Sequence, residues 1–102
     1  MIESRAAAVY VSAATVWEIE IKRALGRLKA PEDVLAMVDE AGFQALSISV
    51  EHARAAGQLP LHHGDPFDRM LIAQAQLEGL TLATPDAALG QYGVPVLETG
   101  PA

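Results

Sequence analysis

The chain has 102 residues, of which 51% are hydrophobic, and 13 acidic residues against seven Lys and Arg give it a formal net charge of −6. This composition excludes a disordered chain and argues against a protein that binds nucleic acid by charge alone, since such proteins are usually basic. The absence of cysteine excludes disulfides and thiolate metal sites, which fits a cytoplasmic protein. No apolar run approaches the roughly 20 residues of a membrane span. We expect a single domain over residues 1–102, with no secretory signal at its start.

The first half of the chain predicts alternating strands and helices. Trp17, Ile21, Ala24, Leu25 and Leu28 recur at helical spacing and form one apolar stripe. The expected elements are a strand at 9–12, a helix at 13–28, a helix that opens at Pro31 and closes at Gly42, a strand at 43–48 and a short helix at 50–57.

The second half continues the same alternation. Pro95 lacks the N–H that a central strand donates, so the last strand is expected at an edge of the sheet. The expected elements are a loop at 59–64, a helix from Asp65 to Gly79, a strand at 80–84, a turn of helix at 85–89 and a strand at 94–97. The resulting order, β-α-α-β-α-α-β-α-β, predicts an α/β three-layer sandwich with a mostly parallel sheet.

The helix start at Asp65 is the most informative segment, because two carboxylates precede an apolar run. Asp65 suits the N-cap, Pro66 the first helical position and Asp68 the third. Residues 70–73, Met-Leu-Ile-Ala, leave little polar face, which predicts a helix buried on more than one side. Asp68 is then either an acid at the mouth of a buried helix, where metal chemistry takes place, or part of a variant capping box.

Three acids belong to elements that are expected to meet at one edge of the sheet. In open α/β sheets, sites lie beyond the carboxyl ends of the strands. Asp86 comes two residues after Thr84, where one strand ends. Glu18 lies in the second turn of the helix that leaves Ser12, and Asp68 begins the buried helix. Since Mg²⁺ and Mn²⁺ prefer carboxylate oxygens and activate water for attack on phosphodiesters, a divalent-cation site is one hypothesis for this edge.

Each of these positions also has a structural interpretation. Glu18 and Lys22 are four residues apart and suit an exposed ion pair, and Asp86 suits a turn or a helix cap. Trp17 is expected in the core rather than as a platform for base stacking.

Two further polar groups have alternative interpretations. The adjacent His62 and His63 are expected to face solvent rather than to bind a metal. The basic residues at the end of the first long helix form either a solvated helix end, favoured by the helix dipole, or a surface for phosphate or an acidic partner. These residues are Lys22, Arg23, Arg27 and Lys29.

Several segments resemble PIN-domain toxins of the VapC type. Residues 9–12 and 17–22, Val-Tyr-Val-Ser and Trp-Glu-Ile-Glu-Ile-Lys, resemble the second strand and the following helix of that family. Residues 63–75, His-Gly-Asp-Pro-Phe-Asp-Arg-Met-Leu-Ile-Ala-Gln-Ala, resemble its most distinctive segment. Residues 80–86 resemble its next strand and acidic turn, and residues 92–97 its closing strand. The resemblance covers nearly the whole chain in order, and the long central motif is its specific part.

The resemblance implies a PIN-like fold and a metal-dependent ribonuclease. Such proteins are toxins of two-component toxin–antitoxin modules; they are usually dimeric and are inhibited by a cognate antitoxin. Their acids hold Mg²⁺ or Mn²⁺, and the matching positions in this chain are Glu18, Asp68 and Asp86. The supporting positions are Ser12 and Thr84, through hydroxyl contacts, and Arg69, which orients an acid, touches phosphate or forms a structural ion pair.

The start of the chain departs from the family pattern. The family begins with an apolar strand that ends in Asp, lies in the middle of the sheet and supplies the first metal ligand. This chain begins Met-Ile-Glu-Ser-Arg, and Glu3 is not taken as a substitute for that Asp. The chain resembles a member that lacks about 25–35 N-terminal residues, an estimate from one strand plus one or two helices. Loss of a central strand is expected to leave both flanking strands unpaired, and loss of an acid to weaken the cation site.

Three functions follow as hypotheses. The first is an endoribonuclease that cleaves RNA by in-line attack of a metal-activated water. The second is a catalytically impaired, truncated PIN domain that binds an antitoxin or a second copy of itself through a hydrophobic groove. A generic α/β regulatory domain that uses Asp68 or Asp86 in another way is a third.

Overall fold

The computed structural model describes residues 2–3, 9–29, 33–62, 64–84 and 86–99. Its elements are β1 (Ile2–Glu3), β2 (Val9–Ser12), α1 (Ala13–Ala24), α2 (Val34–Glu40), β3 (Gln44–Leu46), α3 (Val50–Gln58), α4 (Pro66–Glu78), β4 (Thr81–Thr84), the 3-10 helix η1 (Ala87–Tyr92) and β5 (Val96–Glu98). The order after β1 is the one that the sequence predicts. No helix in the described ranges combines the length and apolarity needed to cross a membrane.

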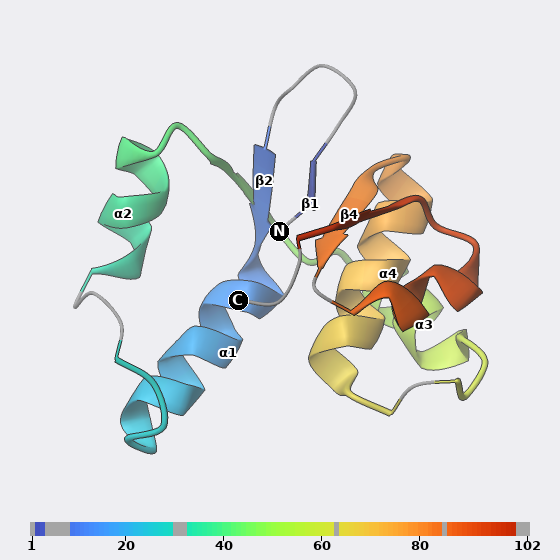
Figure 1. Ribbon diagram of the computed structural model, residues 1–102, viewed down its shortest axis with the longest axis horizontal. Helices are drawn as coiled ribbons and strands as arrows, with labels where there is room; N and C mark the ends of the chain where they lie inside the picture. The colour runs from blue at the N-terminus through green and yellow to red at the C-terminus, as the bar shows by residue number, and fades with distance from the viewer. Residues whose placement is uncertain (1, 4–8, 30–32, 63, 85, 100–102) are drawn as a thin grey trace.

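The strands form one sheet in the order β3-β2-β1-β4-β5 (Figure 1). β2 is parallel to β3 and β4 is parallel to β5, whereas β1 is antiparallel to both of its neighbours. Because β2 and β4 both run against β1, the other four strands all point in one direction. The α/β fold is confirmed, and β5 lies at an edge of the sheet, as the adjacent Pro95 indicates.

β1 corrects the expectation for the centre of the sheet. Ile2 pairs with Tyr10 of β2 on one side and with Leu82 of β4 on the other. The prediction that both flanking strands are left unpaired is therefore wrong where β1 lies between β2 and β4. Backbone N–H and C=O groups need partners whatever the direction of the segment that supplies them, and a reversed two-residue strand does so here.

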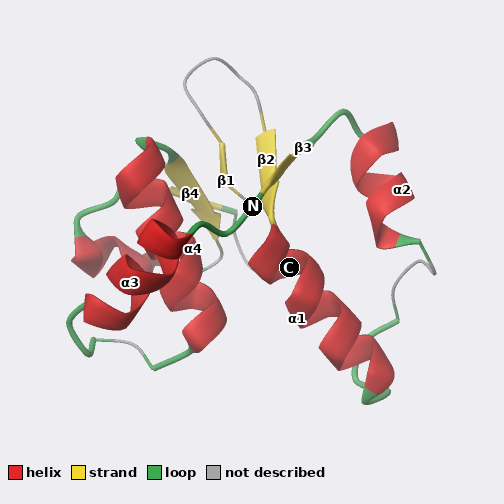
Figure 2. Ribbon diagram, turned by 180° about the vertical axis from the view of Figure 1, so that it is seen from behind, coloured by secondary structure: helices red, strands yellow, loops and turns green. Residues whose placement is uncertain are grey.

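Helices cover both faces of the sheet, and Figure 2 shows α3 and α4 on one side of the strands and α1 and α2 on the other. Neighbouring residues of β2 contact different cores: Tyr10 packs against the core of α4, β4 and η1, and Val11 belongs to the core of α2. The first core consists of Ile72, Ala75, Leu80, Leu82, Leu89, Tyr92 and Val94, and the second of Val11, Val34 and Val38. Since successive strand residues point to opposite faces, the architecture has three layers.

α4 is buried around its middle, as the sequence predicts. Residues 72–75 are four consecutive buried positions, so solvent reaches no side of this part of the helix. Asp65 caps the helix start, because its Oδ1 accepts the N–H groups of Phe67 and Asp68 at 2.8 and 3.2 Å. A proline occupies the first helical position, and Gly79, with a φ of 67°, ends the helix.

α1 differs from its prediction in length and orientation. It ends at Ala24 rather than near residue 28. Trp17 is 61% exposed and Leu25 is 60% exposed, so the prediction that Trp17 is a core residue is wrong. Val16 and Ile19 pack against the core of α2 instead. Helical spacing identifies an apolar face, but it does not identify the element that covers that face.

Two predictions fall on residues outside the described ranges, namely the helix start at Pro31 and the exposure of His63. Among the described residues this helix is α2, which begins at Val34, and its N-cap Asp33 accepts a backbone N–H of the first turn at 3.0 Å. His62 is exposed, as predicted, and its ring meets that of Tyr92 edge to face, with centroids 5.2 Å apart.

The buried side chain of His52 ties α3 to α4. Its Nδ1 accepts the N–H of Ser49 at 3.0 Å, and Oγ of Ser49 accepts the N–H of His52 at 3.0 Å, which forms a capping box. Because Nδ1 is an acceptor, Nε2 carries the ring proton and donates it to Oε2 of Glu78 at 3.0 Å. One side chain thus caps one helix and holds the end of another.

Replacement of this histidine tests the tie. His52→Ala is expected to lower the free energy of unfolding by about 2–3 kcal/mol, because it removes two side-chain hydrogen bonds from a buried position. Urea unfolding followed by circular dichroism measures the change. The matched control is Arg54→Ala on the exposed face of α3, which is expected to change stability by less than about 0.5 kcal/mol. Equal losses in the two variants would contradict the proposed tie.

Candidate active site

The ends of β2 and β4 lie at one rim of the sheet. Ile2 pairs with both strands, so their rows can be matched across β1. Ser12 and Thr84, the last residues of β2 and β4, are each two positions beyond the residue that pairs with Ile2. They therefore lie at the same level of the sheet, two residues beyond the row in which β2 and β4 are two strand spacings, or about 10 Å, apart. The helix that carries Glu18 and the turn that carries Asp86 both start from this level.

Ser12 positions the helix that carries Glu18. Its buried Oγ accepts the N–H of Ala14 at 3.0 Å and caps α1. The Glu18 side chain is 28% exposed, and its Oε2 lies 3.3 Å from Nζ of Lys22. The ion pair that the sequence suggests is therefore present. An exposed pair of this type contributes only about 0.3–0.5 kcal/mol, so it leaves the carboxylate open to a stronger cation.

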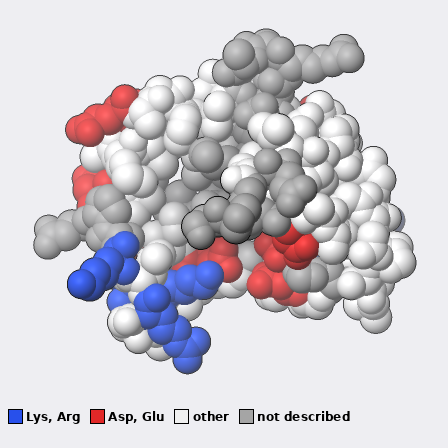
Figure 3. All heavy atoms as spheres, viewed as in Figure 1, with Lys and Arg blue, Asp and Glu red and all other residues white. Residues whose placement is uncertain are grey.

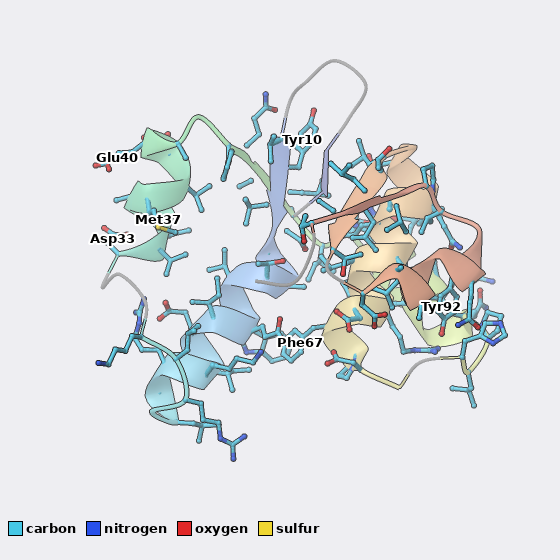
Figure 4. All side chains as sticks on the ribbon, in the orientation of Figure 1. Tyr10, Asp33, Met37, Glu40, Phe67 and Tyr92 are labelled. Carbon is cyan, nitrogen blue, oxygen red and sulfur yellow. The ribbon has the colours of Figure 1, made fainter. Side chains whose placement is uncertain are left out.

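Asp68 lies at the third position of α4 and is half-buried. The preceding residue, Phe67, projects from α4 toward α1 (Figure 4). Its ring meets that of Trp17 edge to face, with centroids 5.2 Å apart and planes at 69°. Glu18 and Asp68 each directly follow one of these aromatic residues, so the ring contact places the two acid-bearing turns side by side.

Asp86 follows β4 in a turn that its own backbone and side chain close. Its N–H donates to Oγ1 of Thr84 at 3.1 Å, and its Oδ1 accepts the N–H of Ala88 at 3.0 Å. The cap role that the sequence leaves open is thus present at the start of η1. The contact with Thr84 holds the backbone of Asp86 next to the end of β4.

Arg69 binds the end of α3. Its Nη2 donates to the carbonyl oxygens of Ala56 and Leu59, each at 2.9 Å, and its Nη1 donates to that of Pro60 at 3.1 Å. The planar guanidinium matches this group of acceptors because it presents several donors in a rigid fork. A structural role for Arg69 was one of the alternatives from the sequence, but these carbonyl partners were not foreseen, since the carbonyl groups at a helix end have no sequence signature.

Charges of opposite sign occupy different parts of the face shown in Figure 3. Asp and Glu atoms gather around the beginning of α4 and the adjoining part of α1 and also lie over α2, and Lys and Arg atoms gather at the far end of α1. Within the basic group, Nη1 of Arg23 lies 3.0 Å from Oε1 of Glu20. The basic residues begin one helical turn after Glu18, so α1 connects the acidic region to the basic one.

Two apolar hollows flank α1. The first, the α1–α2 groove, has a volume of about 300 Å³ and is lined by residues that include Thr15, Ile19, Met37, Val38 and Phe43. The second, the α1–α4 pocket, has a volume of about 330 Å³ and is lined by Ala14, Trp17, Ile48, Pro66, Phe67 and Met70. The sequence suggested a hydrophobic groove without locating it, because the lining residues come from segments that are far apart in the chain.

The model of one protein family, the PIN domain, matches residues 2–95. The chain belongs to the PIN-domain family. The match includes the ends of β2 and β4 and the three predicted acids, and PIN domains are usually nucleases, which supports nuclease activity in general. No curated protein gives a significant match.

PIN-domain nucleases typically use divalent metal ions, and carboxylates are the donors that Mg²⁺ and Mn²⁺ prefer. The donor chemistry of Glu18, Asp68 and Asp86 fits such an ion. Within the described part of the chain, however, no three His, Asp or Glu side chains are grouped so that they could hold a metal. This PIN domain therefore presents suitable carboxylates without assembling three of them into a closed cage. Mg²⁺ is often held by one or two carboxylates together with waters and substrate phosphates.

A substitution can distinguish a structural role of Arg69 in this PIN domain from a role in binding substrate phosphate. Arg69→Lys keeps the positive charge but removes the planar guanidinium and its several donors. We expect the free energy of unfolding to fall by about 1–2 kcal/mol. Chemical denaturation measures the loss, with Arg54→Lys on the exposed face of α3 as the matched control. Unchanged stability together with weaker RNA binding would instead assign Arg69 to the substrate.

Proposed function

We propose that the chain is a Mg²⁺- or Mn²⁺-dependent endoribonuclease and the toxin component of a type II toxin–antitoxin module, acting on RNA in the cytoplasm. The observation that carries this proposal is the common rim of β2 and β4. The helix that carries Glu18 and the turn that carries Asp86 both start from this rim of a PIN-domain sheet. The contact between Trp17 and Phe67 supports the placement of Asp68 beside them.

The three carboxylates have distinct supports in this proposal. Glu18 extends from a capped helix, Asp68 from the first turn of a buried helix, and Asp86 from a turn held by Thr84. A bound divalent cation would activate water for attack on a phosphodiester. The carboxylates repel RNA phosphate until a cation neutralises them, so the chain and its substrate are expected to bind the ion together. We expect the basic residues at the end of α1 to contact further phosphates along the RNA strand.

A second candidate function is a partner-binding module, and the α1–α2 groove favours it. Apart from Thr15, the groove is lined by apolar side chains, and Met37 at its edge is 44% exposed. Oγ1 of Thr15 is buried without a hydrogen-bond partner among the described residues, so a partner could supply one. We propose that a cognate antitoxin binds here, and that the chain forms a homodimer. A chain with an impaired acid site would retain this binding while losing cleavage.

Two acids at the start of α4 provide a matched test of the nuclease proposal. Asp68→Asn is expected to lower the rate of RNA cleavage with Mg²⁺ or Mn²⁺ by about 100-fold or more, since it removes a charge that holds the cation. Asp65→Asn removes the same charge three residues earlier but keeps a side chain that caps a helix well. We expect this control to retain cleavage within about threefold. A gel assay on labelled RNA measures both rates.

Removal of the metal completes this test. Chelation by EDTA is expected to stop cleavage by the parent chain, and Mg²⁺ or Mn²⁺ in excess to restore it. Cleavage that persists in EDTA would contradict metal dependence. If Asp68→Asn cut RNA as fast as the parent chain, Asp68 would not be a ligand. Absence of cleavage by the parent chain, with antitoxin binding intact, would favour the partner-binding module.

The groove can be tested on one helix. Met37→Glu places a charge in the α1–α2 groove and is expected to weaken binding of the proposed antitoxin about tenfold or more. Leu35→Glu is the control, because Leu35 is 65% exposed on α2 and does not line the groove. Isothermal titration with both variants measures the difference. Equal weakening by the two substitutions would place the partner elsewhere.

A further inference from the structure

The α1–α4 pocket lies beside two of the proposed ligands and has no role in holding the metal. α1 contributes Ala14 and Trp17 to its wall, and α4 contributes Pro66, Phe67 and Met70. Glu18 and Asp68 directly follow the two aromatic wall residues in sequence. A molecule that is held at the carboxylates therefore has this apolar pocket as its immediate neighbour.

We propose that the α1–α4 pocket binds a nucleobase of single-stranded RNA adjacent to the phosphate that is cleaved, with Trp17 as the stacking surface. This inference rests on the proposed nuclease function. It assigns a binding site to a base of the substrate, which the acidic residues do not contact. Trp17 is a positioning residue in this proposal, since it would hold a base and not the reacting atoms.

The geometry of the two rings leaves surface for a base. An edge-to-face pair with planes at 69° covers at most one face of each ring, so each ring keeps a face that the other does not cover. Trp17 is 61% exposed, which is unusual for the largest apolar side chain in a small domain. The volume of about 330 Å³ lies at the lower end of the range for small-molecule pockets. A single planar ring system suits this size.

The lining also predicts how selective the pocket is. Its six side chains carry one hydrogen-bonding group, the indole N–H of Trp17, and the rest are apolar. Stacking on an aromatic side chain tolerates any base because every base has a π-face. We therefore expect the pocket to favour purines over pyrimidines through stacking strength, without reading a sequence.

Charge favours RNA over a second copy of the chain as the occupant. The pocket wall includes Pro66 and Phe67 at the beginning of α4, where Asp and Glu atoms gather in Figure 3, and two copies placed face to face would bring these like charges together. RNA phosphates meet the same carboxylates, but a shared divalent cation removes that repulsion. The basic end of α1 adds attraction for the continuing strand.

Binding of RNA can be measured apart from cleavage. The full chain is used in the Asp68→Asn background with Mg²⁺ present, so that cleavage is slow and a cation neutralises the remaining carboxylates. Fluorescence anisotropy then follows binding of a labelled eight-nucleotide oligoadenylate at low salt. Trp17→Leu, which keeps an apolar side chain but no ring, is expected to lower affinity about tenfold. Trp17→Phe retains a ring and is expected to retain most of the affinity.

Controls separate stacking from other effects. Leu25→Ala removes an equally exposed apolar side chain from the end of α1 and is expected to leave affinity unchanged. An abasic oligoribonucleotide keeps the phosphates but has no bases, and it is expected to bind equally to the Trp17→Leu variant and to its parent. Because Trp17 is the only tryptophan, its fluorescence reports directly on the pocket and should be quenched by oligoadenylate but not by the abasic strand.

Three results would overturn the inference. The first is equal oligoadenylate affinity of Trp17→Leu and its parent, and the second is equal quenching by the abasic strand. The third is a dimer in sedimentation that Trp17→Leu dissociates with RNA affinity unchanged, which would make the pocket a contact between copies. Cleavage by the parent chain with Mg²⁺, despite any of these results, would leave the nuclease proposal standing. Binding through Trp17 without cleavage would remove the nuclease proposal alone.

Discussion

The common direction of β2 and β4 is the constraint on which the rest of this PIN domain depends. Both strands pair with β1 through the same residue, so their ends lie at one level of the sheet. α1 continues from one end and the turn of Asp86 from the other. α4 packs on β4, and its start reaches α1 through the contact of Phe67 with Trp17. Three segments that are distant in the sequence thereby approach one rim.

Local physical rules made much of this arrangement predictable. Asp65 and Gly79 mark the ends of α4 because a side-chain oxygen can accept orphan N–H groups and a glycine can take a positive φ. The apolar run between them predicted the burial of α4 without knowledge of its partners. The alternation of helices and strands predicted the layers, and an acidic residue after a strand end indicated the edge of the sheet at which a site is expected.

The features that the sequence could not predict depend on partners that are distant in the chain. β1 is too short to have a periodic pattern, and its antiparallel direction follows only from what lies on either side of it. Trp17 belongs to an apolar stripe that indicated a buried face, but Val16 and Ile19 make the core contact of α1. The contacts of Arg69 depend on where the end of α3 lies, and the residues next to Arg69 in the sequence do not determine that position.

The carbonyl oxygen of Pro60 connects the two elements that carry Asp68 and Asp86. It accepts a hydrogen bond from Nη1 of Arg69 at 3.1 Å and another from the hydroxyl of Tyr92 at 2.9 Å. Arg69 follows Asp68 in α4, and Tyr92 ends the 3-10 helix that Asp86 begins. Surface loops usually accept insertions without harm. In this loop an insertion is expected to disturb both elements, because one extra residue would shift a single oxygen atom that accepts hydrogen bonds from α4 and from η1.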